Sequence, residues 1–204
     1  ERTLGCILPM MAGSSVAFSR SPQTLAEDFK SVRPTVFLGV PRIYERIVAR
    51  IRRKAGSRTL GRWLLETTAR IGWAHREVAT GRGPPPSLLQ RLAWPLLEWF
   101  VAGRVLSALG GRLRVVVSGG APLDPDIARF LAGLGLPLVE GYGLTEAAPV
   151  VTATTFEDSL PGSVGRPLHG VQIRLGVDDE LLVKTPSRMI GYWADAAATN
   201  EVLE

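Results

Sequence analysis

Residues 113–143 constrain the fold most strongly, because they have the pattern of a strand, a short helix and a second strand in close succession. The run "LRVVVS" (113–118) is apolar and β-branched, as buried strands are. Asp124 followed by Pro125 is typical of a helix start, and glycines close that helix within about ten residues. The segment "PLVEGYG" (137–143) predicts the next strand. Two strands joined through a helix run parallel, so the sequence predicts a βαβ unit.

Glycines and polar residues follow both predicted strands. "SGGAP" (118–122) comes after the first strand and "GYGLTE" (141–146) after the second. Each segment alone is typical of an ordinary turn. Loops that follow neighbouring parallel strands emerge at one edge of the sheet, however, and open α/β sheets bind ligands at this carboxyl edge. The glycines let backbone amides approach a ligand, while Tyr142 offers a flat ring, Thr145 a hydroxyl and Glu146 an oxygen ligand for Mg²⁺. The paired loops therefore predict a nucleoside triphosphate site.

The chain before this unit is predicted to contain one buried strand, "TVFLGV" (35–40), and three helices. Helices are predicted over 41–56, 59–80 and 87–109, the last with a kink at Pro95. Apolar residues at helical spacing are expected to face inward: Leu60, Trp63, Leu64, Thr67 and Ile71, then Leu88, Leu89, Leu92, Leu96, Leu97, Phe100 and Val101. No chemical motif falls within these helices, so we expect them to be packing scaffold.

From about residue 150 the helical periodicity stops. Short strands and turns are predicted in "GSVGRPL", "HGVQIRL", "DELLVK" and "MIGYW". The predicted fold is therefore α/β: βαβ units of a mostly parallel sheet with packed helices, followed by a small antiparallel β subdomain. We expect residues 1–150 to form the α/β part and residues 151–204 to begin the β-rich part of the same domain.

The net charge of +5 is carried mainly by arginine, most densely between Arg42 and Lys54. This run fits a solvated helix face, or attraction to an anionic membrane surface or a phosphate-bearing substrate. No nucleic-acid-binding motif accompanies it, so we expect no nucleic-acid partner. Cys6 is the only cysteine, so no intrachain disulfide can form. The apolar N-terminal stretch, interrupted by glycine and proline, is too short to span a bilayer.

Several motifs together resemble the adenylate-forming acyl-CoA synthetases. They are "VVVSGGAPL", "EGYGLTE", "GSVGRPLHGVQIRL" and "DELLVKTPSRMIGYWADAAATNEVLE". Upstream, "ERTLGCILPMMAGSSVAF" and "SVRPTVFLGVPRIYERIVARI" resemble the long-chain fatty acid branch of that family. The resemblance covers essentially the whole chain. It implies that a fatty acid reacts with ATP to give an acyl-adenylate, from which the acyl group passes to coenzyme A, with Mg²⁺ as cofactor.

The resemblance also implies roles for individual residues. Thr145 would bind the α-phosphate and Glu146 would hold Mg²⁺, so these two are the expected catalytic pair. The expected ATP- and AMP-binding residues are Gly119, Gly120, Ala121, Glu140, Gly141, Tyr142, Gly143 and Thr145. Among them, Tyr142 would stack on adenine, and Gly141 and Gly143 would lie near the acyl-phosphate junction.

We expect these 204 residues to be part of a longer chain, because they begin with Glu1 rather than methionine. Family members also carry a Ser/Thr/Gly-rich phosphate loop, a ribose-binding aspartate and a C-terminal domain with a catalytic lysine. None of these falls in the sequence, so we expect it to be inactive alone. The parent is expected to be a cytoplasmic enzyme that can rest on the inner membrane surface, and its oligomeric state stays open. The alternatives are a fatty-acyl-AMP ligase or other adenylating enzyme, or a non-catalytic nucleotide- or lipid-binding relative.

Overall fold

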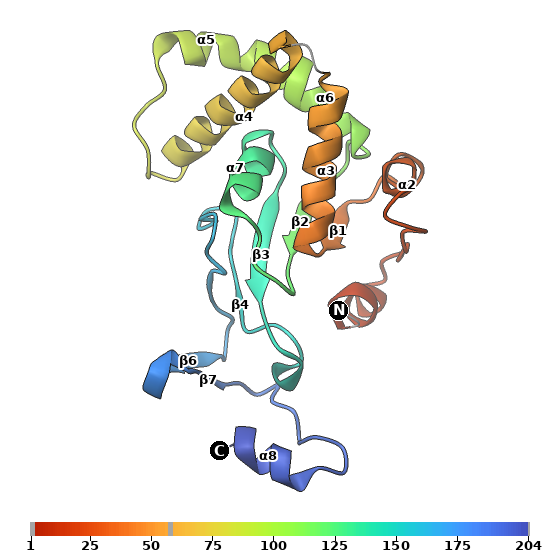
Figure 1. The fold of residues 1–204 in the computed structure, drawn as a ribbon, viewed down its shortest axis with the longest axis vertical. Coiled ribbons are helices and arrows are strands. Elements are labelled where there is room, and N and C mark those ends of the chain that lie inside the picture. Colours follow the sequence, from red (N-terminus) through yellow and green to blue (C-terminus); the bar gives the residue numbers. More distant parts are fainter. Residues whose placement is uncertain (1–2, 57–58, 204) are drawn as a thin grey trace.

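The chain builds one five-stranded sheet with helices packed on it, and a separate two-stranded hairpin (Figure 1). A computed structural model describes residues 3–56 and 59–203. The sheet has the order β1 (Val36–Gly39), β2 (Val115–Ser118), β3 (Leu138–Tyr142), β4 (Thr152–Ala153), β5 (Arg166–Pro167). The first three strands are parallel, whereas β4 and β5 are added antiparallel. The hairpin pairs β6 (Gln172–Leu175) with β7 (Leu181–Lys184).

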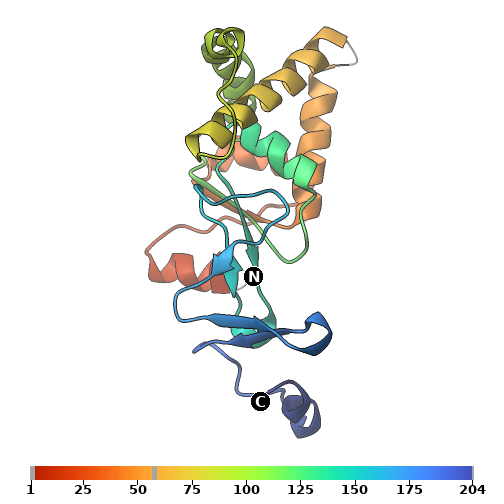
Figure 2. The same ribbon diagram turned by 90° about the vertical axis from the view of Figure 1, so that its left-hand side faces the viewer.

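Helices α3 to α7 gather at one end of the molecule, and the β6–β7 hairpin with α8 lies at the other, as Figures 1 and 2 both show. The described α-helices and the π-helical turns η1 and η2 are, in chain order, η1 (Thr3–Ile7), α1 (Leu8–Met11), α2 (Leu25–Val32), α3 (Pro41–Lys54), α4 (Thr59–Ala79), α5 (Leu88–Leu97), η2 (Glu98–Ala102), α6 (Gly103–Ala108), α7 (Pro125–Gly133) and α8 (Ala196–Val202). Single turns occur at η3 (Thr145–Ala147) and η4 (Val177–Asp179). Across the described ranges, no helix has both the length and the hydropathy needed to cross a bilayer.

The predicted βαβ unit is confirmed as β2–α7–β3. Asp124 caps α7 as its sequence position indicates: its Oδ1 accepts a hydrogen bond from the N–H of Asp126 at 2.7 Å, and Pro125 is the first helical residue. The strands β2 and β3 are parallel neighbours, with Ser118 opposite Glu140 at their carboxyl ends. Both following loops therefore leave the sheet at the same edge.

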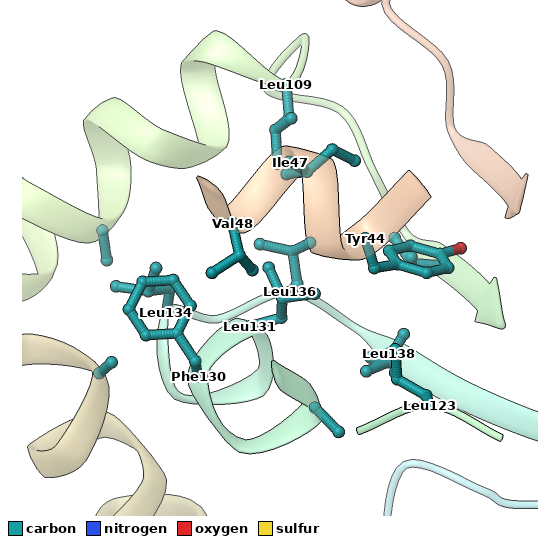
Figure 3. Close-up of a cluster of buried hydrophobic side chains, with 14 of the residues drawn as sticks. Tyr44, Ile47, Val48, Leu109, Leu123, Phe130, Leu131, Leu134, Leu136 and Leu138 are labelled. Carbon is teal, nitrogen blue, oxygen red and sulfur yellow. The ribbon is translucent and has the colours of Figure 1, made fainter. Parts of the chain in front are cut away.

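The core lies between α3, α7 and the sheet (Figure 3). Tyr44 and Val48 of α3 are buried against Leu131 of α7, and the Tyr44 hydroxyl donates to the carbonyl oxygen of Val117 at 2.7 Å. This bond ties α3 to the central strand β2. Ile47 of α3 is buried in this core and Ile43 and Ile51 pack against it, whereas Arg46, Arg50 and Arg53 are exposed on the opposite face.

Helix α4 packs directly on α7 through glycine. A Cβ on Gly72 would overlap the carbonyl oxygen of Gly133, and a Cβ on Gly133 would overlap the backbone of Ala69. The two backbones can touch only because neither glycine has a side chain. This contact fixes α7, and with it the loops on either side of α7.

The helix predicted over residues 87–109 is confirmed in its bounds, because α5, η2 and α6 follow one another without a break from Leu88 to Ala108. Pro95 lies inside α5, and the π-helical turn η2 that follows it was not predicted. The face expected to be buried is wrong. Seven side chains expected to face inward are instead exposed: Leu88, Leu89, Leu92, Leu96 and Phe100, with Leu60 and Trp63 of α4. Periodicity identifies a common face of a helix but not whether another element covers it. No residue of α5 is fully buried, and its partly buried Trp94 stacks on His75 of α4 with ring centroids 5.2 Å apart.

The two ends of the sheet also differ from expectation. The strand predicted as buried, β1, is an edge strand whose Val36 is 53% exposed. After residue 150, β4 and β5 extend the first sheet instead of starting a new one, and only the β6–β7 hairpin stands apart. "MIGYW" forms a loop with one bridge, between Tyr192 and Asp195, and it leads into α8, which was not predicted. The proposed domain division at residue 150 stays a prediction.

Candidate functional site

The two glycine loops lie side by side at the carboxyl edge of β2 and β3. A Cβ on Gly119 would be 3.4 Å from the carbonyl oxygen of Gly141, so their backbones are close neighbours. Gly120 has φ +84°, in the left-handed region that glycine adopts without strain. Gly120 and Ala121 are exposed, which leaves the first loop open to a ligand. The predicted pairing of the loops is therefore present in the structure.

The second loop turns tightly after β3. A Cβ on Gly143 would overlap the carbonyl oxygen of Pro149, so no other residue fits there without moving the loop. The N–H of Val151 donates to the carbonyl oxygen of Tyr142 at 2.9 Å and brings the chain back alongside β3. Tyr142 is 37% exposed, and in the part of the chain described no other ring packs on it. Its ring is thus available to a planar group.

Thr145 and Glu146 form the single turn η3 directly after this loop. Thr145 is exposed. The Glu146 carboxylate accepts a hydrogen bond at Oε1 from the Tyr192 hydroxyl at 2.6 Å. This bond lowers the pKa of Glu146 below its ordinary value and raises that of Tyr192. Glu146 is therefore ionised at neutral pH.

Sequence reasoning did not find Tyr192, which belongs to a segment 46 residues away. The same segment contacts η3 twice more. The N–H of Met189 donates to the carbonyl oxygen of Glu146 at 2.8 Å, and Oγ of Ser187 donates to the carbonyl oxygen of Ala147 at 2.7 Å. Nothing local in "MIGYW" signals such a contact, because it depends on how the chain returns past the hairpin.

Glu140 lies on the inner side of the site and is only 6% exposed. Its backbone N–H donates to Oγ1 of Thr154 at 2.8 Å, and its carbonyl oxygen accepts from the N–H of Thr154 at the same distance. Burial raises the pKa of the Glu140 carboxyl to about 7, partly offset by a hydrogen bond from the backbone of Gly162. The backbone of Glu140 thus holds Thr154 beside β3, and its side chain is not presented to solvent.

Among the described residues, the two loops and η3 supply one carboxylate that a metal ion could bind, that of Glu146. Within the described ranges, no group of three or more His, Cys, Asp or Glu side chains is arranged to hold a cation. Mg²⁺ in nucleotide sites is typically held by one or two carboxylates together with substrate phosphates. An ionised Glu146 beside an exposed hydroxyl fits that donor set.

The arginines near the end of α3 differ in whether other side chains contact them. Arg52 is engaged: its Nε donates to Glu66 at 2.8 Å, and its guanidinium lies 4.8 Å from the ring centroid of Phe130. Arg46, Arg50 and Arg53 are exposed on the face opposite the core. Arg52 therefore differs from the other three arginines, because its guanidinium is engaged with neighbouring side chains.

Comparisons with known proteins identify the family of the chain. Residues 1–193 match the family described as AMP-binding enzyme. The chain is 34% identical over 188 residues to the long-chain-fatty-acid–CoA ligase FadD15 of Mycobacterium bovis, covering 92% of this chain and 31% of that protein. It is 34% identical over 217 residues to human long-chain-fatty-acid–CoA ligase 1, covering all of this chain and 29% of that protein. The chain thus spans about a third of the length of these relatives.

Solved structures show the same fold. A benzoate CoA ligase from Burkholderia xenovorans LB400 superimposes with a TM-score of 0.60 at 20% identity, over 97% of this chain and 32% of that one. The o-succinylbenzoate CoA synthetase of Bacillus subtilis, in complex with its acyl-adenylate intermediate, gives a TM-score of 0.60 at 16% identity, over 97% and 32%. With the family match extending over residues 1–193 and the paired loops in place, the chain belongs to the AMP-binding enzyme family of adenylate-forming CoA ligases.

Proposed function

We propose that the protein containing this chain activates a long-chain fatty acid with ATP and then transfers the acyl group to coenzyme A. In the first step a carboxylate oxygen attacks the α-phosphorus of ATP, and pyrophosphate leaves. In the second step the sulfur of coenzyme A attacks the acyl carbon, AMP leaves, and the thiol proton is released. The family uses ATP and coenzyme A. The long-chain substrate is proposed from relatives at 34% identity that are named for it.

The contact between the Gly119 and Gly141 loops is the observation that carries the nucleotide part of the proposal. It supports an adenine held between the backbone of residues 119–121 and the exposed ring of Tyr142. Thr145, the first residue of η3, would donate a hydrogen bond from its hydroxyl to the α-phosphate. Preorganised donors of this kind stabilise charge that develops during reaction.

Glu146 is the residue proposed to hold Mg²⁺ with the phosphates of ATP. A bound Mg²⁺ would neutralise charge on the departing pyrophosphate. The contribution of the chain is to keep the carboxylate ionised and in place, and the lowered pKa of Glu146 supports this role.

The test uses the full-length protein with ATP, Mg²⁺ and a panel of acids, with and without coenzyme A. We expect AMP and acyl-CoA to form with palmitate but not with benzoate or malonate, the acids of ligases that share the fold. Turnover of benzoate or malonate alone would keep the reaction class and overturn the substrate. Acyl-adenylate that forms without transfer to coenzyme A would indicate a fatty-acyl-AMP ligase. Nucleotide binding without turnover of any acid would indicate a non-catalytic relative.

A further inference from the structure

Tyr192 joins the last segment of the chain to the turn that carries Glu146. Its hydroxyl donates to Oε1 of Glu146 at 2.6 Å. Met189 and Ser187 of the same segment instead donate to backbone carbonyl oxygens of η3, at 2.8 Å and 2.7 Å. Tyr192 therefore acts on the side chain of Glu146, whereas Met189 and Ser187 hold the backbone of the turn.

Tyr192 is itself held in place from the other side. Its backbone N–H donates to Oγ1 of Thr199 at 2.9 Å, and the Thr199 hydroxyl donates to the carbonyl oxygen of Asp195 at 2.7 Å. Gly191 permits this approach, since a Cβ there would stand 2.8 Å from Cγ2 of Thr199. Asp195 also caps α8 through the N–H of Ala198 at 2.9 Å. The backbone of Tyr192 is thus bonded to α8, and its hydroxyl is bonded to Glu146.

A hydroxyl that donates one proton to a carboxylate fixes its direction without saturating it. An ionised carboxylate has about four lone-pair positions, and Tyr192 uses one of them. The remaining positions can serve a cation. Partners that hydrogen-bond a ligating carboxylate typically change metal affinity or activity by about 10- to 100-fold when they are removed.

We propose that Tyr192 is a positioning residue that orients the Glu146 carboxylate for the divalent cation accompanying ATP. This inference rests on the proposed function. It gives α8 and the segment before it a role in the nucleotide site, although neither lies at the carboxyl edge of the sheet.

The test measures how much Mg²⁺ strengthens nucleotide binding in the full-length protein. Calorimetric titration with α,β-methylene ATP, which cannot release pyrophosphate, gives a Kd with Mg²⁺ and a Kd without it. In the Tyr192→Phe protein, we expect the ratio of the Kd without Mg²⁺ to the Kd with Mg²⁺ to fall by about 10-fold or more. The Kd measured without Mg²⁺ should change little. Trp193→Phe is the matched control, because Trp193 is the neighbouring aromatic residue and is 98% exposed. It should keep the wild-type ratio.

A second comparison asks whether Tyr192 acts through Glu146. Once Glu146→Gln is present, adding Tyr192→Phe should change the ratio no further, because residues that act as a unit are not additive. A wild-type ratio in Tyr192→Phe, or an equal further loss in the Glu146→Gln background, would overturn the inference while the proposed function stands. If the wild-type protein binds no analogue at all, the proposed function fails, and this inference fails with it.

Discussion

Gly119 and Gly141 come from different loops, yet a Cβ on Gly119 would stand only 3.4 Å from the carbonyl oxygen of Gly141. An alanine fits at that distance, whereas the two methyl groups of a valine would extend over the edge where the nucleotide is proposed to lie. In the full-length protein we expect Gly119→Val to raise the KM for ATP by roughly 10-fold, equivalent to about 1.4 kcal/mol of binding free energy. Gly119→Ala should have a much smaller effect. An unchanged KM for ATP in a stably folded Gly119→Val protein would remove this loop from the site.

The raised pKa of Glu140 predicts a pH-dependent stability. The folded-state pKa of about 7 lies above the ordinary value of 4.5, so between these pH values the folded protein keeps a proton that the unfolded chain has released. Stability should therefore fall as the pH rises from about 4.5 through about 7.

Glu140→Gln removes this titration and keeps an oxygen that can accept the hydrogen bond from Gly162. Thermal unfolding of both proteins from pH 5 to pH 8 is the measurement. We expect the variant to match wild type near pH 5 and to be more stable near pH 8, by on the order of 1–3 kcal/mol. Parallel curves over this range would mean that Glu140 is ionised in the folded protein at neutral pH.

The exposed arginines of α3 give a test of membrane attraction. In the full-length protein, replacing Arg46, Arg50 and Arg53 with glutamine should weaken the free energy of binding to anionic vesicles by about 1 kcal/mol per residue. Co-sedimentation with the vesicles measures this binding. Arg52→Gln is the matched control, because its guanidinium is held by Glu66 and Phe130. The control should bind vesicles as wild type does but melt at a lower temperature. Vesicle binding unaffected by the triple change would identify the run as a solvated helix face.

Local signals in the sequence were sufficient to predict the elements that position the site. Pro41 and the Asp124–Pro125 pair mark helix starts through their own backbone and capping preferences, and the apolar runs mark β2 and β3. The parallel pairing then follows from chain connectivity, so the meeting of the two loops could be predicted. A further local signal was overlooked: Asp195 before three alanines is a helix start, and it caps α8.

Contacts between distant segments could not be predicted in this way. The bond from Tyr192 to Glu146 spans 46 residues and depends on the path of the chain after the hairpin. The exposed leucines of α5 show the same limit, since their spacing is that of a buried face and only the tertiary structure shows that they are uncovered. The addition of β4 and β5 to the first sheet depends likewise on the turn after Tyr142.

The most direct test of the central claim replaces Glu146 and Thr145 separately in the full-length protein and measures acyl-adenylate formation across a Mg²⁺ titration. Glu146→Gln keeps the size of the side chain but removes its charge, so a hard cation loses much of its attraction. We expect kcat to fall by about 10²-fold at limiting Mg²⁺, since the loss is felt mainly in the transition state, and to recover in part as Mg²⁺ is raised. Thr145→Val should also lower kcat, but without recovery, because it removes only a hydroxyl. If Glu146→Gln retains the wild-type kcat at limiting Mg²⁺, Glu146 does not hold the metal, and the account of this site is contradicted.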